Sequence, residues 1–209
     1  MPFGFLRRGP RPPTPAAAAP GRAGQESRGI PFDGLTEEWR LVGRMEIEGR
    51  LSDILNRREQ VPINGVRWAP VDGSEELTPA PGLELIDPFD LIAVLAGAAT
   101  LPSFSAAERA AHKLHKVPYD VALDLPPFRV VGTVYLFPGS EPERLLDRST
   151  DLFVPVTEAV VFLGERPLND AGVDVVLVNR SYLRGIDQVD RHTVLAARAL
   201  LGPVADEPD

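Results

Sequence analysis

The stretch WRLVG at residues 39–43 returns later in the chain as FRVVG at residues 128–132. Three further landmarks follow in the same order in both places: ILNR (54–57) and LLDR (145–148), VPI (61–63) and VPV (154–156), GLELI (82–86) and GVDVV (172–176). Such a repeated order predicts two tandem copies of one small module. Each copy has about 65 residues, near the lower limit for a self-sufficient core, so we expect the copies to pack together. Two independent units on a linker are the alternative.

The first landmark of each copy shows the alternation of a half-buried strand. One face collects the apolar side chains and a glycine, namely Trp39, Leu41, Gly43, Met45 and Ile47, and copy two repeats this with Phe128, Val130, Gly132, Val134 and Leu136. A glycine on the inward face predicts a sharp bend or a close backbone approach. Small barrels need such bends to close their sheet.

Further elements follow in parallel in both copies. A helical turn is expected at 52–56 and after Ser140, then strands at 61–69 and 152–163, and two shorter strands at 82–87 and 90–96, or 172–178 and 182–189. Helices are expected at 105–116 and 194–201. Pro62 and Pro155 remove a backbone donor at matched places, which predicts a strand edge or a bulge.

These elements predict a mainly β fold with short helices: a tandem duplication of a small SH3- or Sm-like β-barrel module, preceded by a disordered N-terminal arm. A pair of twisted sheets is the competing architecture. The expected boundaries are a Pro/Ala/Gly-rich arm at 1–30, copy one at 35–104, a helical linker at 105–126, copy two at 127–190, a C-terminal helix at 191–202 and an acidic tail at 203–209. The arm buries too little apolar surface to offset its ordering entropy.

Composition narrows the function classes. Apolar residues make up 44% and charged residues 25%, as in ordinary globular proteins, and the net charge is −8. An acidic body repels phosphate backbones, so nucleic-acid binding is not expected. The chain has no cysteine, which excludes disulfides, thiolate nucleophiles and cysteine-bound zinc and fits a cytoplasmic location. The sequence has no signal-peptide core and no run of about 20 apolar residues that would span a membrane.

Catalytic chemistry finds little support. His112 and His115 share a predicted helix face, but neighbouring lysines oppose a cation and no HExxH pattern is present. Glu46 and Glu48 are expected on a solvent-exposed strand face, whereas acid–base work would require one of them to be buried. The triplet 56–58 (NRR) is similar to the entry of cyclic-dinucleotide-binding barrels, but the second half of that motif is missing. We therefore predict no catalytic, cofactor-binding or metal-binding residue.

Repeated polar residues are candidates for an interface. The outward arginines of the first strands and those after the helical turns recur, and they could pair with acids of a neighbouring copy. Ordinary surface salt bridges, which contribute little, are the alternative. The interface candidates are Arg40, Arg129, Arg57, Arg148, Pro62 and Pro155.

The stretch RLSDILN at residues 50–56, followed by VPIN at 61–64, resembles a small bacterial domain of unknown function with the pattern R-L-S/T-D-x-L-N. Copy two keeps VTEAV at 156–160, close to the family's second motif, but has RLLD at 144–147 in place of the first. The resemblance covers a little over half of the chain and implies no catalytic residues.

Together these observations predict a cytoplasmic, non-enzymatic scaffold or adaptor protein that binds protein partners or further copies of itself, without cofactor or metal. An Sm-like protein that binds nucleic acid or a nucleotide is the first alternative, although it rests on the fold alone. An enzyme with an unrecognised site is the second.

Overall fold

A computed structural model describes residues 29–97, 116–147 and 151–202. The first part of the chain forms mainly strands: β1 (Ile30–Leu35), β2 (Trp39–Met45), α1 (Leu51–Asn56), β3 (Val61–Pro70), β4 (Thr78–Pro79), β5 (Leu85–Ile86), the 3-10 turn η1 (Pro88–Asp90) and β6 (Ala93–Gly97). The second part forms β7 (Val117–Leu125), β8 (Phe128–Leu136), the 3-10 helix η3 (Pro142–Leu146), β9 (Phe153–Leu163), β10 (Arg166–Pro167), β11 (Val173–Asn179), β12 (Gly185–Gln188) and α3 (Arg191–Ala199).

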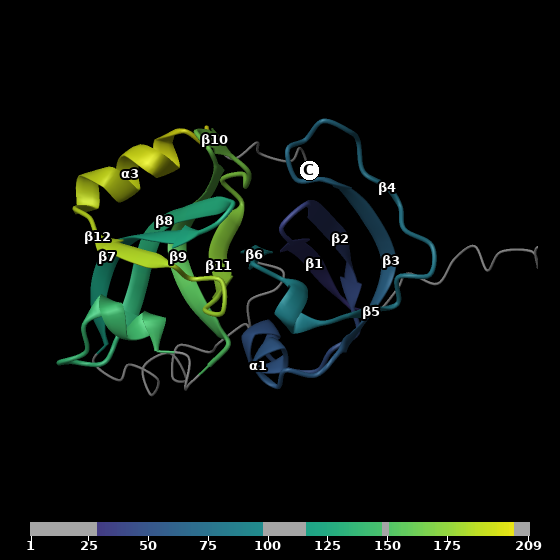
Figure 1. Ribbon diagram of the computed structural model, residues 1–209, viewed down its shortest axis with the longest axis horizontal. Coiled ribbons are helices and arrows are strands. Elements are labelled where there is room, and N and C mark those ends of the chain that lie inside the picture. Colours follow the sequence, from purple (N-terminus) through teal and green to yellow (C-terminus); the bar gives the residue numbers. More distant parts are fainter. Residues whose placement is uncertain (1–28, 98–115, 148–150, 203–209) are drawn as a thin grey trace, which may run out of the picture.

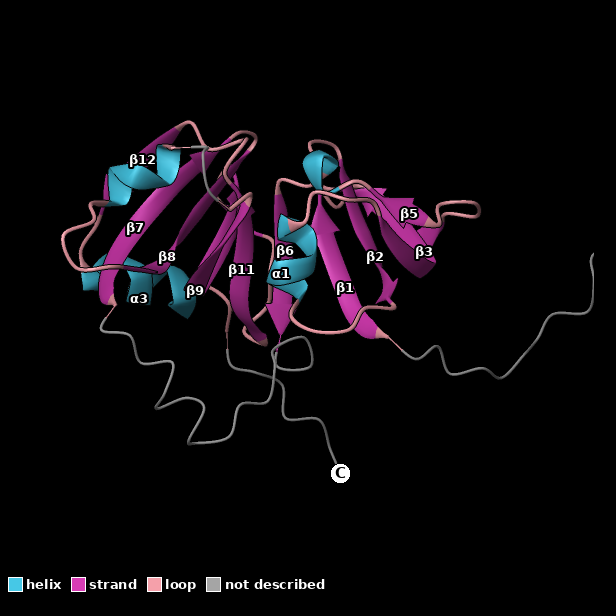
Figure 2. Cartoon of the chain, turned by 90° about the horizontal axis from the view of Figure 1, so that it is seen from below, coloured by secondary structure: helices cyan, strands magenta, loops and turns pink. Residues whose placement is uncertain are grey.

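The strands form one large antiparallel sheet in the order β12-β7-β8-β9-β11-β6-β1-β2-β3-β4, with β10 on β9 and β5 on β3. Figure 2 shows this succession, in which β11 and β6 lie side by side although they are far apart in the sequence. The prediction of a mainly β fold with short helices is confirmed. The expected closed barrels are not seen, because the sheet stays open from β12 to β4.

The seam between the two halves is a strand pair. β6 and β11 align antiparallel from Val173 opposite Gly97 to Val178 opposite Ala93. Figure 1 shows β6 between the lobe of β1–β5 and the lobe that carries β11. Four of the seven residues of β11 are valines and its last four residues are buried, as expected where a strand is covered on both faces.

Both hydrophobic cores extend across this seam. The larger core, built on β7–β9, also includes Leu35 and Ile92 from the first half. The core under β1–β3 also includes Phe153 and Leu177 from the second half. Each half therefore completes the other's core, and α3 covers the opposite face of β7–β9 through Val194 and Ala197.

Two buried or half-buried asparagines tie the seam together by imitating backbone groups. The Asn56 side chain accepts from the Phe153 N–H at 2.7 Å and donates to the Phe153 carbonyl at 3.2 Å. The fully buried Asn179 side chain donates to the carbonyls of Pro88 and Leu91. Polar groups so placed stabilise only when satisfied, and here the backbone of the other half supplies both partners of Asn56 and the two acceptors of Asn179.

The inward glycines mark close approaches, as their position in the sequence predicts. The strand pairing shifts register around Gly43 between β2 and β3, and around Gly132 between β8 and β9. A Cβ on Gly132 would lie 2.7 Å from Val156 Cγ1 and 2.9 Å from the Thr157 carbonyl oxygen. A Cβ on Gly43 would lie 3.0 Å from the Asn64 carbonyl oxygen. A side chain at Gly132 would therefore force β9 to shift, whereas one at Gly43 would make a tight contact.

Some predicted boundaries differ from the structure. Each half begins with a strand that the alternation did not indicate, β1 and β7, so residues 117–125 of the expected linker are a strand. The helix expected at 105–116 lies outside the described residues, except for its last residue, as do most of the arm and the acidic tail. Arg50 and Glu141 take the N-cap positions of α1 and η3 without a side-chain cap, whereas Asp190 caps α3 by accepting from the Thr193 N–H at 2.8 Å.

Candidate functional site

Two stacked tryptophans lie on the surface of the first half. The rings of Trp39 and Trp68 are 5.0 Å apart between centroids, with 25° between their planes. Trp39 is 36% exposed and Trp68 is 39% exposed. They are the only tryptophans of the chain. An exposed aromatic pair is unusual enough on a protein surface to mark a candidate contact area.

Local backbone structure holds the pair in place. Trp39 opens β2 after a tight turn, in which its N–H donates to Thr36 Oγ1 at 3.0 Å and its carbonyl accepts from the Thr36 N–H at 2.8 Å. Trp68 lies near the end of β3, directly opposite Leu41 of β2. Because paired residues point to one face of a sheet, both indoles extend the face that carries Leu41 and the first core.

Four exposed glutamates come from the segments that flank this pair. Glu37 and Glu38 directly precede Trp39, and Glu75 and Glu76 lie in the β3–β4 loop. That loop starts beside the first segment, since the Val71 N–H donates to the Glu38 carbonyl at 2.8 Å. It ends where Thr78 pairs with Trp68. We call Trp39, Trp68 and these four glutamates the tryptophan surface; it combines an exposed apolar pair with four negative charges from the adjoining segments.

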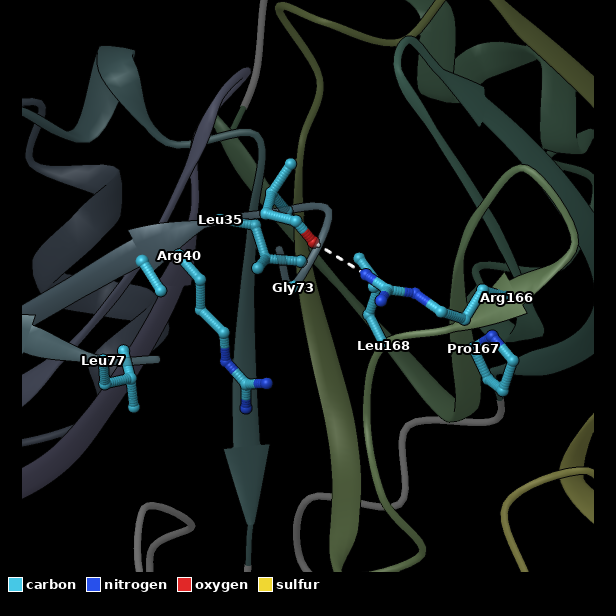
Figure 3. A pocket seen from close by; sticks show the side chains of 9 residues that line it. Leu35, Arg40, Gly73, Leu77, Arg166, Pro167 and Leu168 are labelled. Atoms are coloured by element: carbon cyan, nitrogen blue, oxygen red, sulfur yellow. Dashed lines mark hydrogen bonds between the residues drawn. The ribbon is translucent and has the colours of Figure 1, made fainter. Parts of the chain in front are cut away.

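The other face of the same two strands borders a pocket at the seam. Arg40 and Ala69, neighbours of the tryptophans in β2 and β3, line it together with the β3–β4 loop and residues 166–168. Its volume is about 260 Å³. Figure 3 shows Arg40 and Arg166 entering from opposite sides, with Arg166 donating to the Val71 carbonyl at 3.0 Å.

The arginines of this pocket are engaged with the protein itself. Arg40 Nε donates to Asp33 Oδ1 at 3.0 Å, and its Nη2 donates to Asp33 Oδ2. The hydrogen bond that Arg40 donates to Asp33 raises the pKa of Arg40, and burial opposes this rise in part. A bidentate pair of this kind fixes both side chains and neutralises the charge. The pocket therefore joins the two halves through Arg166, and the charge of Arg40 is neutralised within the first half.

The predicted interface residues are not brought together into one surface. Arg40 pairs with Asp33 of its own half, and the exposed Arg129 lies 3.8 Å from Asp187. Arg57 and Pro62 line a shallow pocket of about 360 Å³ that also includes Glu46 and Glu48.

Pro62 faces solvent beside β5, and Pro155 pairs with Leu177 of β11. Arg148 lies outside the described residues. The interface role of all six residues stays a prediction.

A buried arginine is the feature that sequence reasoning missed in the second half. Arg180 is 5% exposed, and its guanidinium donates to the carbonyls of Leu145 at 2.7 Å and Arg144 at 2.9 Å, with further bonds to Asp147 and Asp151. Burial lowers the pKa of Arg180. These bonds hold η3 and the segment after it against β11, so the role is structural.

Metal and membrane chemistry find no site in the part of the chain that is described. Among these residues, no three His, Asp or Glu side chains cluster in a way that could hold an ion. His112 and His115 lie outside them, and His192 is exposed at the start of α3. None of the helices within the described ranges is long and apolar enough to cross a bilayer.

Comparison of the chain with protein-family models, with curated proteins and with solved structures found no match. The resemblance to the small bacterial domain of unknown function therefore stays a prediction based on residues 50–64.

Proposed function

We propose that the chain is a tandem duplication of one SH3- or Sm-like module. Strand order supports this, because each half pairs its strands in the same sequence. The first half runs β6-β1-β2-β3 with β4 and β5 on β3, and the second runs β12-β7-β8-β9 with β10 and β11 on β9. A helical turn lies at the same place in both halves: α1 connects β2 to β3, and η3 connects β8 to β9.

Matching details of register add to this support. Ile86 lies opposite Val61, and Val178 lies opposite Val154. The register therefore matches Ile86 with Val178, whereas the GLELI and GVDVV landmarks match Ile86 with Val176. The alignment of the two copies shifts by two residues at this strand. With this alignment Asp87 matches Asn179, and both accept a hydrogen bond at 2.9 Å from the N–H two residues later. The same Asx turn thus leads into the last strand of each module.

For the function we propose a non-catalytic adaptor that binds a short basic segment of a partner protein. The tryptophan surface carries this proposal: two indoles, each more than one third exposed, are flanked by four glutamates. Aromatic residues supply most of the energy at many interfaces, and an acidic border selects basic partners through complementary charge. Single-stranded nucleic acid is the alternative because bases stack on aromatic rings, but the glutamates repel its phosphates.

Self-association through the sheet edges is disfavoured by charge. In the alignment of the two modules, Asp187 of β12 takes the place of Leu95 in β6, and Glu84 takes the place of Val176 in β11. Leu95 and Val176 are opposite each other in the seam. If a second chain were added head to tail, β12 of one chain would pair with the β5 segment of the other in the register of the seam. Asp187 would then lie opposite Glu84, and like charges in that position are destabilising. The modules therefore pair once, within one chain.

Affinity capture from the native lysate, combined with light scattering, tests the adaptor proposal. The bait is the full chain, compared with a W39Q/W68Q variant and with L195Q as a matched control, since Leu195 is 53% exposed on α3. Circular dichroism checks that both variants stay folded. We expect partners that the wild type and L195Q retain and that the tryptophan variant loses. A wild type that captures nothing, or a tryptophan variant that captures the same set, contradicts the proposal.

A further inference from the structure

We infer that residues 7–15 of the chain's own N-terminal arm bind the tryptophan surface of the same molecule. This inference rests on the proposed function, since it assigns an occupant to the same surface. The segment reads RRGPRPPTP and contains three arginines and four prolines. It carries a charge of +3 and is the most proline-rich part of a chain whose net charge is −8.

The chemistry of the segment fits the surface. Proline fixes φ near −65° and favours the polyproline II helix, whose flat rings dock on exposed aromatic side chains. The segment loses little conformational entropy on binding, because its prolines are already restricted. Arginine guanidinium groups stack on indole faces and pair with carboxylates. Trp39 and Trp68 supply the faces, and Glu37, Glu38 and the two loop glutamates supply the carboxylates.

The length of the arm also fits. The described chain starts at Gly29, whose carbonyl accepts from Arg44 Nη2 beside the end of β2. Trp39 is at the other end of β2, and a seven-residue strand spans about 20 Å. Residues 16–28 connect the segment to Gly29, and a flexible coil of that length has a root-mean-square span of about 20 Å. A linker whose span matches the distance gives the highest effective concentration.

That match makes even a weak contact well populated. Short flexible linkers give effective concentrations on the order of 1 mM, so a segment with a dissociation constant of about 0.1 mM occupies its site about 90% of the time. Binding within one molecule is independent of protein concentration. It weakens with salt, because screening shortens from about 10 Å at 0.1 M to about 3 Å at 1 M. A basic partner segment would have to displace the arm to bind.

Tryptophan fluorescence reports this contact directly, because both tryptophans of the chain belong to the surface. The experiment measures acrylamide quenching of the full-length wild type, of an R7E/R8E/R11E variant and of an R22E/R28E control. The control reverses arginines of the same arm outside the proline-rich segment. We expect the wild type and the control to be protected, and the triple variant to be quenched more strongly. A synthetic peptide of residues 5–16 should restore the protection of the triple variant.

Equal quenching of the wild type and the triple variant would overturn the inference, and so would a control that behaves as the triple variant does. Protection that disappears on dilution of the wild type would overturn binding within one molecule and assign the segment to a second copy. The two proposals fail separately. If partners are captured through the tryptophan surface but the arm gives no protection from quenching, the adaptor proposal stands and the binding of the arm is refuted. If the arm protects the tryptophans but no partner is captured, the binding of the arm stands and the adaptor proposal is refuted.

Discussion

Replacing Gly132 by alanine tests the explanation of the bend in β8. The new Cβ would lie 2.7 Å from Val156 Cγ1, 2.9 Å from the Thr157 carbonyl oxygen and 3.0 Å from Ala159 Cα. Two of these three atoms are backbone atoms of β9, so strand β9 itself has to shift. Overpacking of this kind costs about 1–3 kcal/mol, and we expect G132A at the upper end, near 3 kcal/mol.

The chain supplies two matched comparisons. At Gly43 the nearest atoms are 3.0–3.1 Å away, and two of them belong to the flexible Ile63 side chain, so G43A should cost about 1 kcal/mol. At Gly185 the nearest atom is Asp124 Cβ at 3.6 Å, an ordinary contact. G185A should leave the free energy of unfolding unchanged or raise it by up to about 1 kcal/mol, because alanine restricts the unfolded chain.

Urea denaturation followed by circular dichroism measures all three variants. The midpoint of G132A should fall while the slope m stays constant, since the surface exposed on unfolding does not change. In thermal unfolding, a loss of about 3 kcal/mol lowers the midpoint by about 6–12 °C for a chain of this size. If G132A and G185A unfold at the same urea concentration, the close approach of β8 and β9 does not explain the glycine.

Three further changes test other parts of the structure. Replacing Arg180 by methionine leaves several carbonyls without their donor. The free energy of unfolding should therefore fall by about 3 kcal/mol in the same urea assay. An unchanged urea midpoint would contradict the structural role of Arg180. Arg191 lowers the pKa of Glu158, so this pair should stabilise the fold above the unfolded pKa of about 4.3 and lose its contribution as the pH falls through the lower folded pKa. The stability difference between wild type and E158Q should therefore shrink on acidification, and a difference that stays constant with pH would argue against the pair. Charge reversal E84K should make the outer edges complementary and produce head-to-tail oligomers in light scattering, which the further change D187K should disperse; E84K that stays monomeric would contradict the role of charge at these edges.

The alternation of apolar residues was enough to predict β2 and β8, their inward glycines and most later strands. It did not indicate β1 and β7, because Pro31 and Pro118 interrupt their patterns and Gly34 adds no apolar side chain to the face. This omission had a consequence for Arg40, whose partner Asp33 lies on the undetected β1. The pairing of Arg40 with a neighbouring copy was inferred without that carboxylate.

The sequence pattern did not predict that Trp39 and Trp68 lie on the same face of the sheet. Trp39 belongs to the alternating face of β2, but the face of Trp68 depends on an irregularity within β3. Residues Val61 and Ile63 point to the core, and after Gly65, which has a φ of +59°, the inward positions continue at Val66. A local pattern read without this extra residue places Trp68 on the opposite face from Trp39.

The β6–β11 pairing was beyond sequence reasoning for a different reason. Both strands are short and apolar, and nothing in their local sequence specifies which distant strand each one joins. The expectation that the two halves pack together rested on their small size. The structure adds that they pack through paired backbone groups and shared cores.

This pairing has a practical consequence for dividing the polypeptide. A cut in the connection between β6 and β7 leaves every described strand intact, and each fragment carries one strand of the seam. Fragments 1–97 and 117–209 would each present an uncovered apolar edge and an incomplete core. They should reassemble when mixed, so the protein is a natural candidate for a split reporter whose signal depends on reunion of the two pieces.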